Sequence, residues 1–102
     1  MQRNAKSLPG PYLGGVFCGG MFWHYGDTPE DAALKAAKQA RRDLRDLGRL
    51  KRGSPAREWT VNVWDVRGAV EWSLAMGGDM VLTMADGTEK EVGVDSHHDI
   101  VV

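Results

Sequence analysis

The chain has 102 residues, of which 42% are hydrophobic and 26% charged, and its net charge is −1. This length suits one domain, and the composition is that of a folded globular protein rather than a disordered segment. No apolar stretch reaches the roughly 20 residues of a membrane helix. Residues 1–6 lack an apolar signal-peptide core, and the single Cys18 excludes an internal disulfide. We therefore expect a cytoplasmic protein with no membrane partner.

The beginning of the chain differs in character from the rest. Residues 1–11 carry two prolines around a glycine, a composition that favours irregular backbone. We predict a flexible N-terminal arm over residues 1–11 and a single domain over residues 12–102. The segment from Tyr12 to Tyr25 is apolar and aromatic, which predicts two short strands, or one strand broken at Gly19-Gly20.

The clearest local pattern is a helix from Thr28 to about Gly48. Thr28 is a good N-cap and Pro29 suits the first helical position, while Gly48 suits the C-terminal cap. At about 100° per residue, the apolar side chains fall in one arc. They are Ala33, Ala36, Ala37, Ala40, Leu44 and Leu47. This arc predicts the helix face that packs on a sheet.

The second half of the chain has the composition of strands. Trp59 to Trp64, Met80 to Met84 and Glu89 to Val94 favour strand, and Ile100 to Val102 could add an edge strand. Residues 69–76 fit a strand or a short helix, and their bordering glycines favour a strand. This order predicts an α+β fold in one pair of layers. One long helix packs on an antiparallel sheet of about four to five strands, in the order β-α-β-β-β-β.

Charge is distributed unevenly along the chain. Residues 35–57 hold nine basic residues against two acidic ones, and residues 58–102 hold nine acidic residues against two basic ones. On the helix, the basic side chains follow one flank of the apolar arc, whereas Asp43 and Asp46 lie on the other flank. We predict that the basic flank binds a macromolecule. The predicted partner-binding residues are Lys38, Arg41, Arg42, Arg45, Arg49, Arg52 and Trp64.

Trp64 belongs to this set because of strand geometry. Trp59 and Trp64 are an odd number of positions apart, so on a regular strand they point to opposite faces. If one of them lies in the core, the other lies on the outer face, unless the arm or the tail covers it. An exposed tryptophan there would suit a protein interface or the stacking of a base.

These features favour a small binding or regulatory protein, not an enzyme. The expected partner is a protein with an acidic surface or a second copy of the chain, and oppositely charged segments of two copies could form a homodimer. Neutralisation within one copy would account for the charges equally well. Nucleic-acid binding through the same helix is the alternative, because phosphate backbones attract such a flank. Small accessory proteins of phages and mobile elements are an analogy for such a chain.

A metal-dependent enzyme is the third reading. Asp95 to Asp99 reads Asp-Ser-His-His-Asp, which offers ligands that divalent metals accept. Neighbouring residues on a strand point to opposite faces, however, so His97 and His98 would not converge. Whether they bind a metal stays open, and we predict no catalytic residue and no cofactor. Cys18 follows two apolar residues, as is typical of a small buried hydrophobic side chain.

The sequence from Gly26 to Ala33, Gly-Asp-Thr-Pro-Glu-Asp-Ala-Ala, is similar to the strand-to-helix junction of HicB-type antitoxins. That family pairs a small α+β domain with a toxin and often carries a separate DNA-binding segment. The resemblance is confined to these residues, most of which are helix-capping residues. We therefore carry no function over from it.

Overall fold

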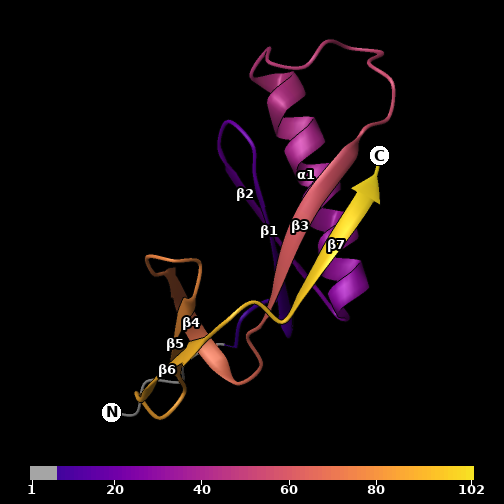
Figure 1. Cartoon of the computed structure of the whole chain (residues 1–102). Coiled ribbons are helices and arrows are strands. Elements are labelled where there is room, and N and C mark those ends of the chain that lie inside the picture. Colours follow the sequence, from indigo (N-terminus) through magenta and orange to yellow (C-terminus); the bar gives the residue numbers. More distant parts are fainter. Residues whose placement is uncertain (1–6) are drawn as a thin grey trace.

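The computed structural model describes residues 7–102 (Figure 1). Its elements are β1 (Tyr12–Phe17), β2 (Met21–Gly26), α1 (Pro29–Asp46), β3 (Glu58–Asp65), β4 (Ala69–Leu74), β5 (Met80–Met84), β6 (Glu89–Val92) and β7 (Ser96–Val101). The predicted α+β class is confirmed, and the segment left open between strand and helix is the strand β4. No helix within residues 7–102 is both long and apolar enough to cross a membrane.

The prediction of a single sheet is wrong. The described strands form a large sheet in the order β2-β1-β3-β7 and a small sheet in the order β4-β5-β6, both antiparallel. β4 does not pair with β3 because the chain turns away after Asp65. The amide of Val66 donates to the carbonyl of Pro11 (2.9 Å), and Gly68 has a left-handed φ of 82°. In the predicted order of strands, β4 would pair with β3. In the structure β7 occupies that position.

The ends of α1 follow the capping pattern of the sequence. The Thr28 hydroxyl accepts a hydrogen bond from the Asp31 amide (3.0 Å), and the Asp31 carboxylate accepts one from the Asp27 amide (3.0 Å). At the other end, Gly48 has a φ of 73° and its amide donates to the Arg45 carbonyl. The predicted N-cap is confirmed, and the helix ends two residues before Gly48.

Thr28→Ala is expected to lower the free energy of unfolding by about 1 kcal/mol, because the Asp31 amide loses its acceptor. Urea denaturation followed by circular dichroism measures this change. Thr28→Ser keeps the hydroxyl and serves as the matched control. Equal stability of the alanine and serine variants would contradict the capping role.

α1 covers one face of the large sheet. Its buried residues are Ala32, Ala33, Ala36, Ala37, Ala40 and Leu44. The predicted burial of Leu47 is wrong: its side chain is 63% exposed, because it caps the helix beyond the last packed turn. The helix lies close to the sheet, since a Cβ built on Gly14 would come within 2.6 Å of the Ala32 carbonyl oxygen. Small side chains on both elements therefore set their separation.

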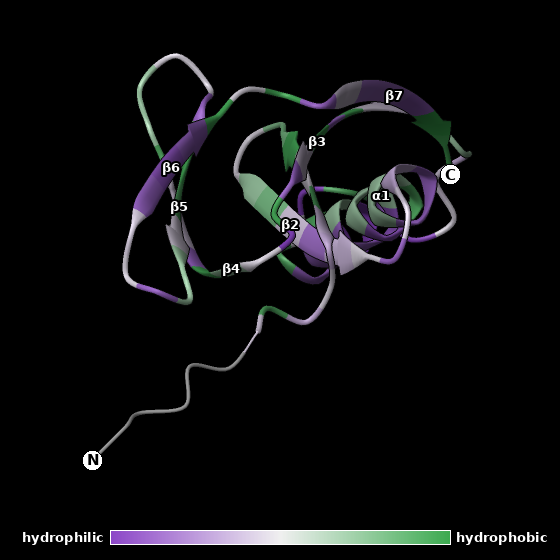
Figure 2. Cartoon of the chain, turned by 90° about the horizontal axis from the view of Figure 1, so that it is seen from below, coloured by the Kyte–Doolittle hydropathy of each residue, from purple (hydrophilic) through white to green (hydrophobic). Residues whose placement is uncertain are grey.

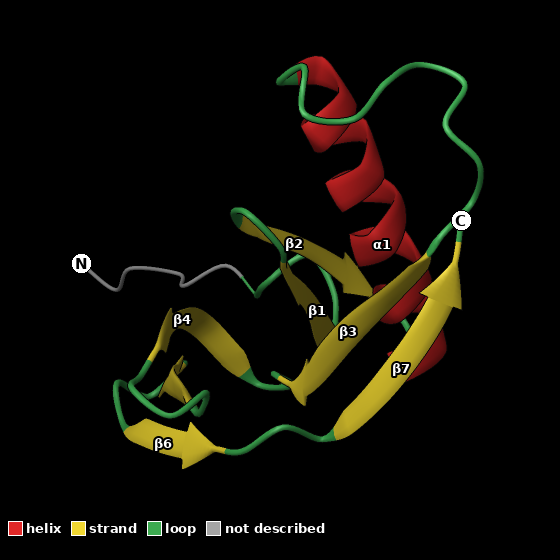
Figure 3. Ribbon diagram, turned by 45° about the horizontal axis from the view of Figure 1, so that its top comes forward, coloured by secondary structure: helices red, strands yellow, loops and turns green. Residues whose placement is uncertain are grey.

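The small sheet covers part of the opposite face of the large sheet (Figure 3). The core between them contains Leu13, Trp64, Val66, Ala69, Met80 and Leu82. Trp59 packs in the helix-side core instead, so the two tryptophans do face opposite sides as predicted. The predicted exposure of Trp64 is wrong, because the small sheet and the rings of Trp23 and Phe17 bury it completely. Its indole Nε1 donates to the Gly78 carbonyl (3.0 Å).

Most of the predicted N-terminal arm, residues 1–6, lies outside the described residues. Residues 7–11 form neither helix nor strand, but they contact the domain. Leu8 packs against the core between the sheets, and the Pro11 carbonyl holds the Val66 amide. The packed part of the chain thus begins before the predicted boundary at residue 12.

Candidate functional site

Three basic side chains form a stripe on the solvent side of α1. Lys38, Arg42 and Arg45 are exposed, and their spacing of four and three residues places them on one face of the helix. With a rise of 1.5 Å per residue, the stripe is about 10 Å long. None of the three side chains forms a hydrogen bond or an ion pair with another residue of the described range 7–102. We call these three residues the basic ridge.

Two other predicted residues are engaged within the fold. The half-buried Arg41 donates to the carbonyls of Ser54 (2.6 Å) and Val102 (3.2 Å), so it fastens the loop after α1 to the end of the chain. Arg49 donates to the carbonyl of Gly19 in the turn between β1 and β2 (2.5 Å). Arg41 therefore has a structural role, and Arg49 lies just beyond the C-terminal end of α1 with part of its donor capacity used.

The remaining two predicted residues lie apart from each other. Arg52 is exposed in the loop that follows α1, whereas Trp64 is buried on the far side of the large sheet. Trp64 is therefore not part of the exposed surface to which the basic side chains belong. The exposed aromatic side chain on that face is Phe17, which is 45% exposed and packs edge-on against Trp23 with ring centroids 5.3 Å apart.

The flanks of the ridge carry acidic as well as basic side chains, and the exposed Asp46 lies one turn after Arg42. Lys35 pairs with Asp31 (3.0 Å), and the pKa of that carboxyl is lowered first by the Asp27 amide and then by the Lys35 ammonium. Asp43 lies on the other flank and accepts a hydrogen bond from the Gln39 amide (2.9 Å). Leu34, 37% exposed, lies one turn before Lys38. The ridge is thus a positive stripe bordered by an exposed apolar side chain.

The histidines near the C-terminus do not converge. His97 Nδ1 lies 2.7 Å from Asn62 Oδ1, and His98 Nε2 lies 2.8 Å from Ser96 Oγ. The two imidazoles point to opposite faces of the large sheet, because they are adjacent on β7. Within residues 7–102, no three His, Cys, Asp or Glu side chains are grouped as metal ligands would be.

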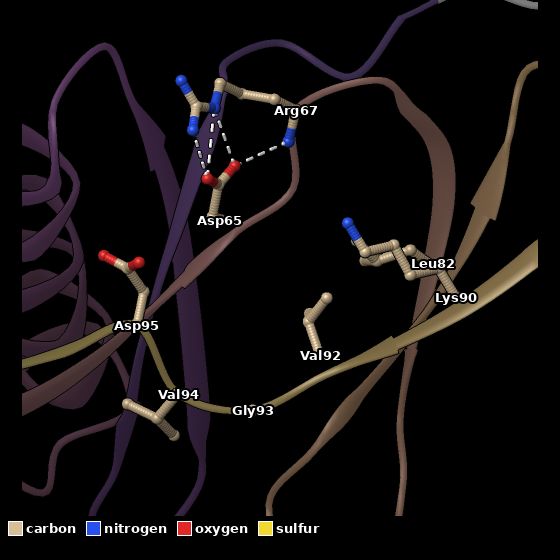
Figure 4. A pocket seen from close by; sticks show the side chains of 8 residues that line it. All are labelled: Asp65, Arg67, Leu82, Lys90, Val92, Gly93, Val94 and Asp95. Carbon is tan, nitrogen blue, oxygen red and sulfur yellow. Dashed lines mark hydrogen bonds and ion pairs between the residues drawn. The ribbon is translucent and has the colours of Figure 1, made fainter.

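A cleft that was not predicted from the sequence lies between the two sheets (Figure 4). It has a volume of about 580 Å³ and is lined by Asp65, Arg67, Leu82, Lys90, Val92, Gly93, Val94 and Asp95. Arg67 forms an ion pair with Asp65 (2.6 Å), which lowers the pKa of Asp65 and raises that of Arg67. Because the lining charges are of both signs, the cleft has no clear preference for anions or cations.

Cys18 is half-buried and packs against the helix-side core, close to the role predicted for it. Arg57 lies nearby: its Nη2 is 3.9 Å from the Cys18 sulfur, and its guanidinium stacks 3.8 Å above the centre of the Trp59 ring. No base lies against the thiol among the contacts described for it. Cys18 and Arg57 therefore contribute to packing around Trp59 and the helix-side core.

No family model, curated protein or solved structure matches this chain. The function is therefore inferred from the surfaces described above.

Proposed function

We propose that this protein is a non-enzymatic binding protein whose basic ridge docks on an acidic surface of a partner protein. Lys38, Arg42 and Arg45 make the primary contacts, and Arg52 contributes from the adjoining loop. The observation that carries the proposal is the stripe of three exposed cations that form no ion pair with another residue of the range 7–102. Exposed ion pairs each contribute only about 0–1 kcal/mol, so the ridge acts mainly on association rate and orientation.

Two features favour a protein partner over a nucleic acid. Leu34 is exposed on α1 one turn before Lys38, and such an apolar side chain gains by burial in a protein interface. The second half of the chain also carries the excess of acidic residues, and β6 is mostly hydrophilic (Figure 2). A long polyanion that extended beyond the helix would meet this negative charge and be repelled.

A different protein is also favoured over a second copy as the occupant of the ridge. Unless it is reciprocated about a two-fold axis, docking the ridge of one copy on the acidic half of another is a head-to-tail contact, which continues into a ring or an open filament. A foreign acidic surface ends the assembly after one contact. We therefore expect a complex of defined composition.

The test compares three immobilised proteins in a nuclease-treated extract of host cells. These are the wild type, a ridge variant (Lys38→Gln, Arg42→Gln and Arg45→Gln), and a control variant (Lys51→Gln, Arg67→Gln and Lys90→Gln) that loses the same charge elsewhere. We expect the wild type and the control to retain one common set of proteins, quantified by mass spectrometry. The ridge variant should retain them at least about tenfold less, the effect of losing about 1.4 kcal/mol.

Equal recovery by all three proteins would refute the role of the ridge, provided that their circular dichroism spectra agree. The nucleic-acid alternative has its own measurement, the retention of duplex DNA and single-stranded RNA over a range of salt concentrations. If retention falls log-linearly with salt concentration and the ridge variant is not retained, the partner is a nucleic acid and not a protein.

A further inference from the structure

β7 is an edge strand with regular geometry. It pairs with β3 on one side, and no other described strand lies on its second side (Figure 3). Its register with β3 runs without a bulge from Glu58 opposite Val101 to Val63 opposite Ser96. The strand contains no proline. It therefore lacks the bulges and prolines that commonly prevent an edge from pairing with another chain.

The hydrogen-bonding groups that β7 leaves free follow from its pairing. Arg57 and Val102 exchange both of their backbone hydrogen bonds (3.0 and 3.1 Å). Since such pairs alternate along antiparallel strands, the peptide groups of every second residue before Val102 also face β3. The peptide groups that point away from β3 are those of His97, Asp99 and Val101, whose side chains are all exposed.

Those side chains share one face of the large sheet. Ile100 and Val102 pack in the helix-side core, so alternation places His97, Asp99 and Val101 on the other face. His97 uses Nδ1 with Asn62 Oδ1, which leaves its Nε2 without a partner among the described residues. Asp99 Oδ1 accepts from the Thr60 hydroxyl (3.2 Å), which leaves its Oδ2 free to accept. The edge thus presents an imidazole and a carboxylate two residues apart, each held in place and each with an unused atom.

We propose that two copies of the chain join their large sheets through β7, antiparallel and about a two-fold axis perpendicular to the sheet. Because this axis is perpendicular to the sheet, both helices lie on the same side of the joined sheet. Each side chain of β7 then lies opposite a side chain that points to the same face. With His98 on the axis, His97 of each copy lies opposite Asp99 of the other. The peptide groups of these two residues are the outward-pointing ones, so they can complete the ladder between the copies.

Charge selects this register over its neighbours. Placing Asp99 on the axis would set the carboxylates of the two copies directly opposite each other, and placing His97 there would set Asp99 opposite Asp95. Like charges directly opposite are destabilising, and opposite charges stabilise a cross-strand pair. Of these three registers, only the one centred on His98 forms two imidazole–carboxylate pairs. This inference is independent of the proposed function, because the basic ridge lies on α1 and takes no part in the contact.

A charge exchange tests the register. Sedimentation velocity across a range of concentrations gives the dimer dissociation constant for the wild type, His97→Asp, Asp99→His and the double variant His97→Asp/Asp99→His. Each single variant places like residues opposite each other and should raise the constant by roughly tenfold. The double variant recreates both pairs with the partners exchanged and should restore the wild-type constant. A double variant that dimerises no better than the single ones would overturn the register.

A backbone test keeps the proposal falsifiable if the exchange variants fold poorly. Asp99→Pro removes an amide that faces away from β3, so the monomer should keep its circular dichroism spectrum while the dimer is lost. Asp99→Asn keeps that amide and should weaken the dimer only modestly. A wild-type protein that stays monomeric at several hundred micromolar would refute the dimer, and a dimer that survives Asp99→Pro would show that the copies meet elsewhere.

Discussion

Trp64→Ala is expected to lower the free energy of unfolding by about 3–5 kcal/mol, the range for removing a large buried aromatic side chain. Trp64 is completely buried between the two sheets, and its indole donates the hydrogen bond that holds the Gly78 carbonyl in the turn between β4 and β5. Its removal leaves a cavity where the small sheet rests on the large one. Urea denaturation followed by circular dichroism measures the loss.

Trp64→Phe is the matched control, because it keeps an aromatic ring in the core and loses only the indole nitrogen and part of the volume. Its loss of stability should be clearly smaller than that of the alanine variant. We also expect the alanine variant to bind a dye for exposed apolar surface, since the small sheet loses its main support. An alanine variant as stable as the wild type would contradict the packing of the two sheets.

Gly26→Ala should cost about 3 kcal/mol, at the upper end of the usual range for overpacking. Gly26 ends β2 beneath the first turn of α1, and a Cβ there would collide with the backbone of Ala32 and Asp31. Backbone atoms within a helix cannot rotate away as a side chain can, so the helix must shift from the sheet. Thermal denaturation measures the decrease in melting temperature.

Gly93→Ala is the control for this substitution. A Cβ on Gly93 would meet only Asp79 Oδ1, at an ordinary contact distance of 3.6 Å. Its stability should stay within about 0.5 kcal/mol of the wild type, as for most surface changes. If Gly26→Ala and Gly93→Ala have the same melting temperature, the close approach of α1 to β2 is contradicted.

The parts of the fold that could be predicted from the sequence are those set by neighbouring residues. Thr28 and Gly48 mark the helix ends because capping depends on residues one turn apart. The division into two sheets could not be predicted, because the pairing of Val63 with Ser96 joins distant parts of the chain. Sequential strands usually pair, and here the Val66 amide turns to Pro11 instead.

The candidate site was predictable to a similar extent. Helical periodicity identified the stripe of Lys38, Arg42 and Arg45, because it is a property of the helix alone. Periodicity could not show that Arg41 faces the carbonyls of the following loop, since this depends on the path of that loop. Strand alternation correctly separated the faces of the two tryptophans in β3. It carried no information about the small sheet that covers Trp64.

The insertion of the small sheet between β3 and β7 has a consequence for the order of folding. Its strands pair only with their immediate neighbours in sequence, so they close short loops at little entropic cost. β7, in contrast, pairs with β3 across the whole inserted segment. Once the small sheet has formed, it shortens the effective loop between those strands and brings Asp65 and Asp95 to the same end of the large sheet. We therefore expect the insertion to nucleate early and the final edge of the domain to form late.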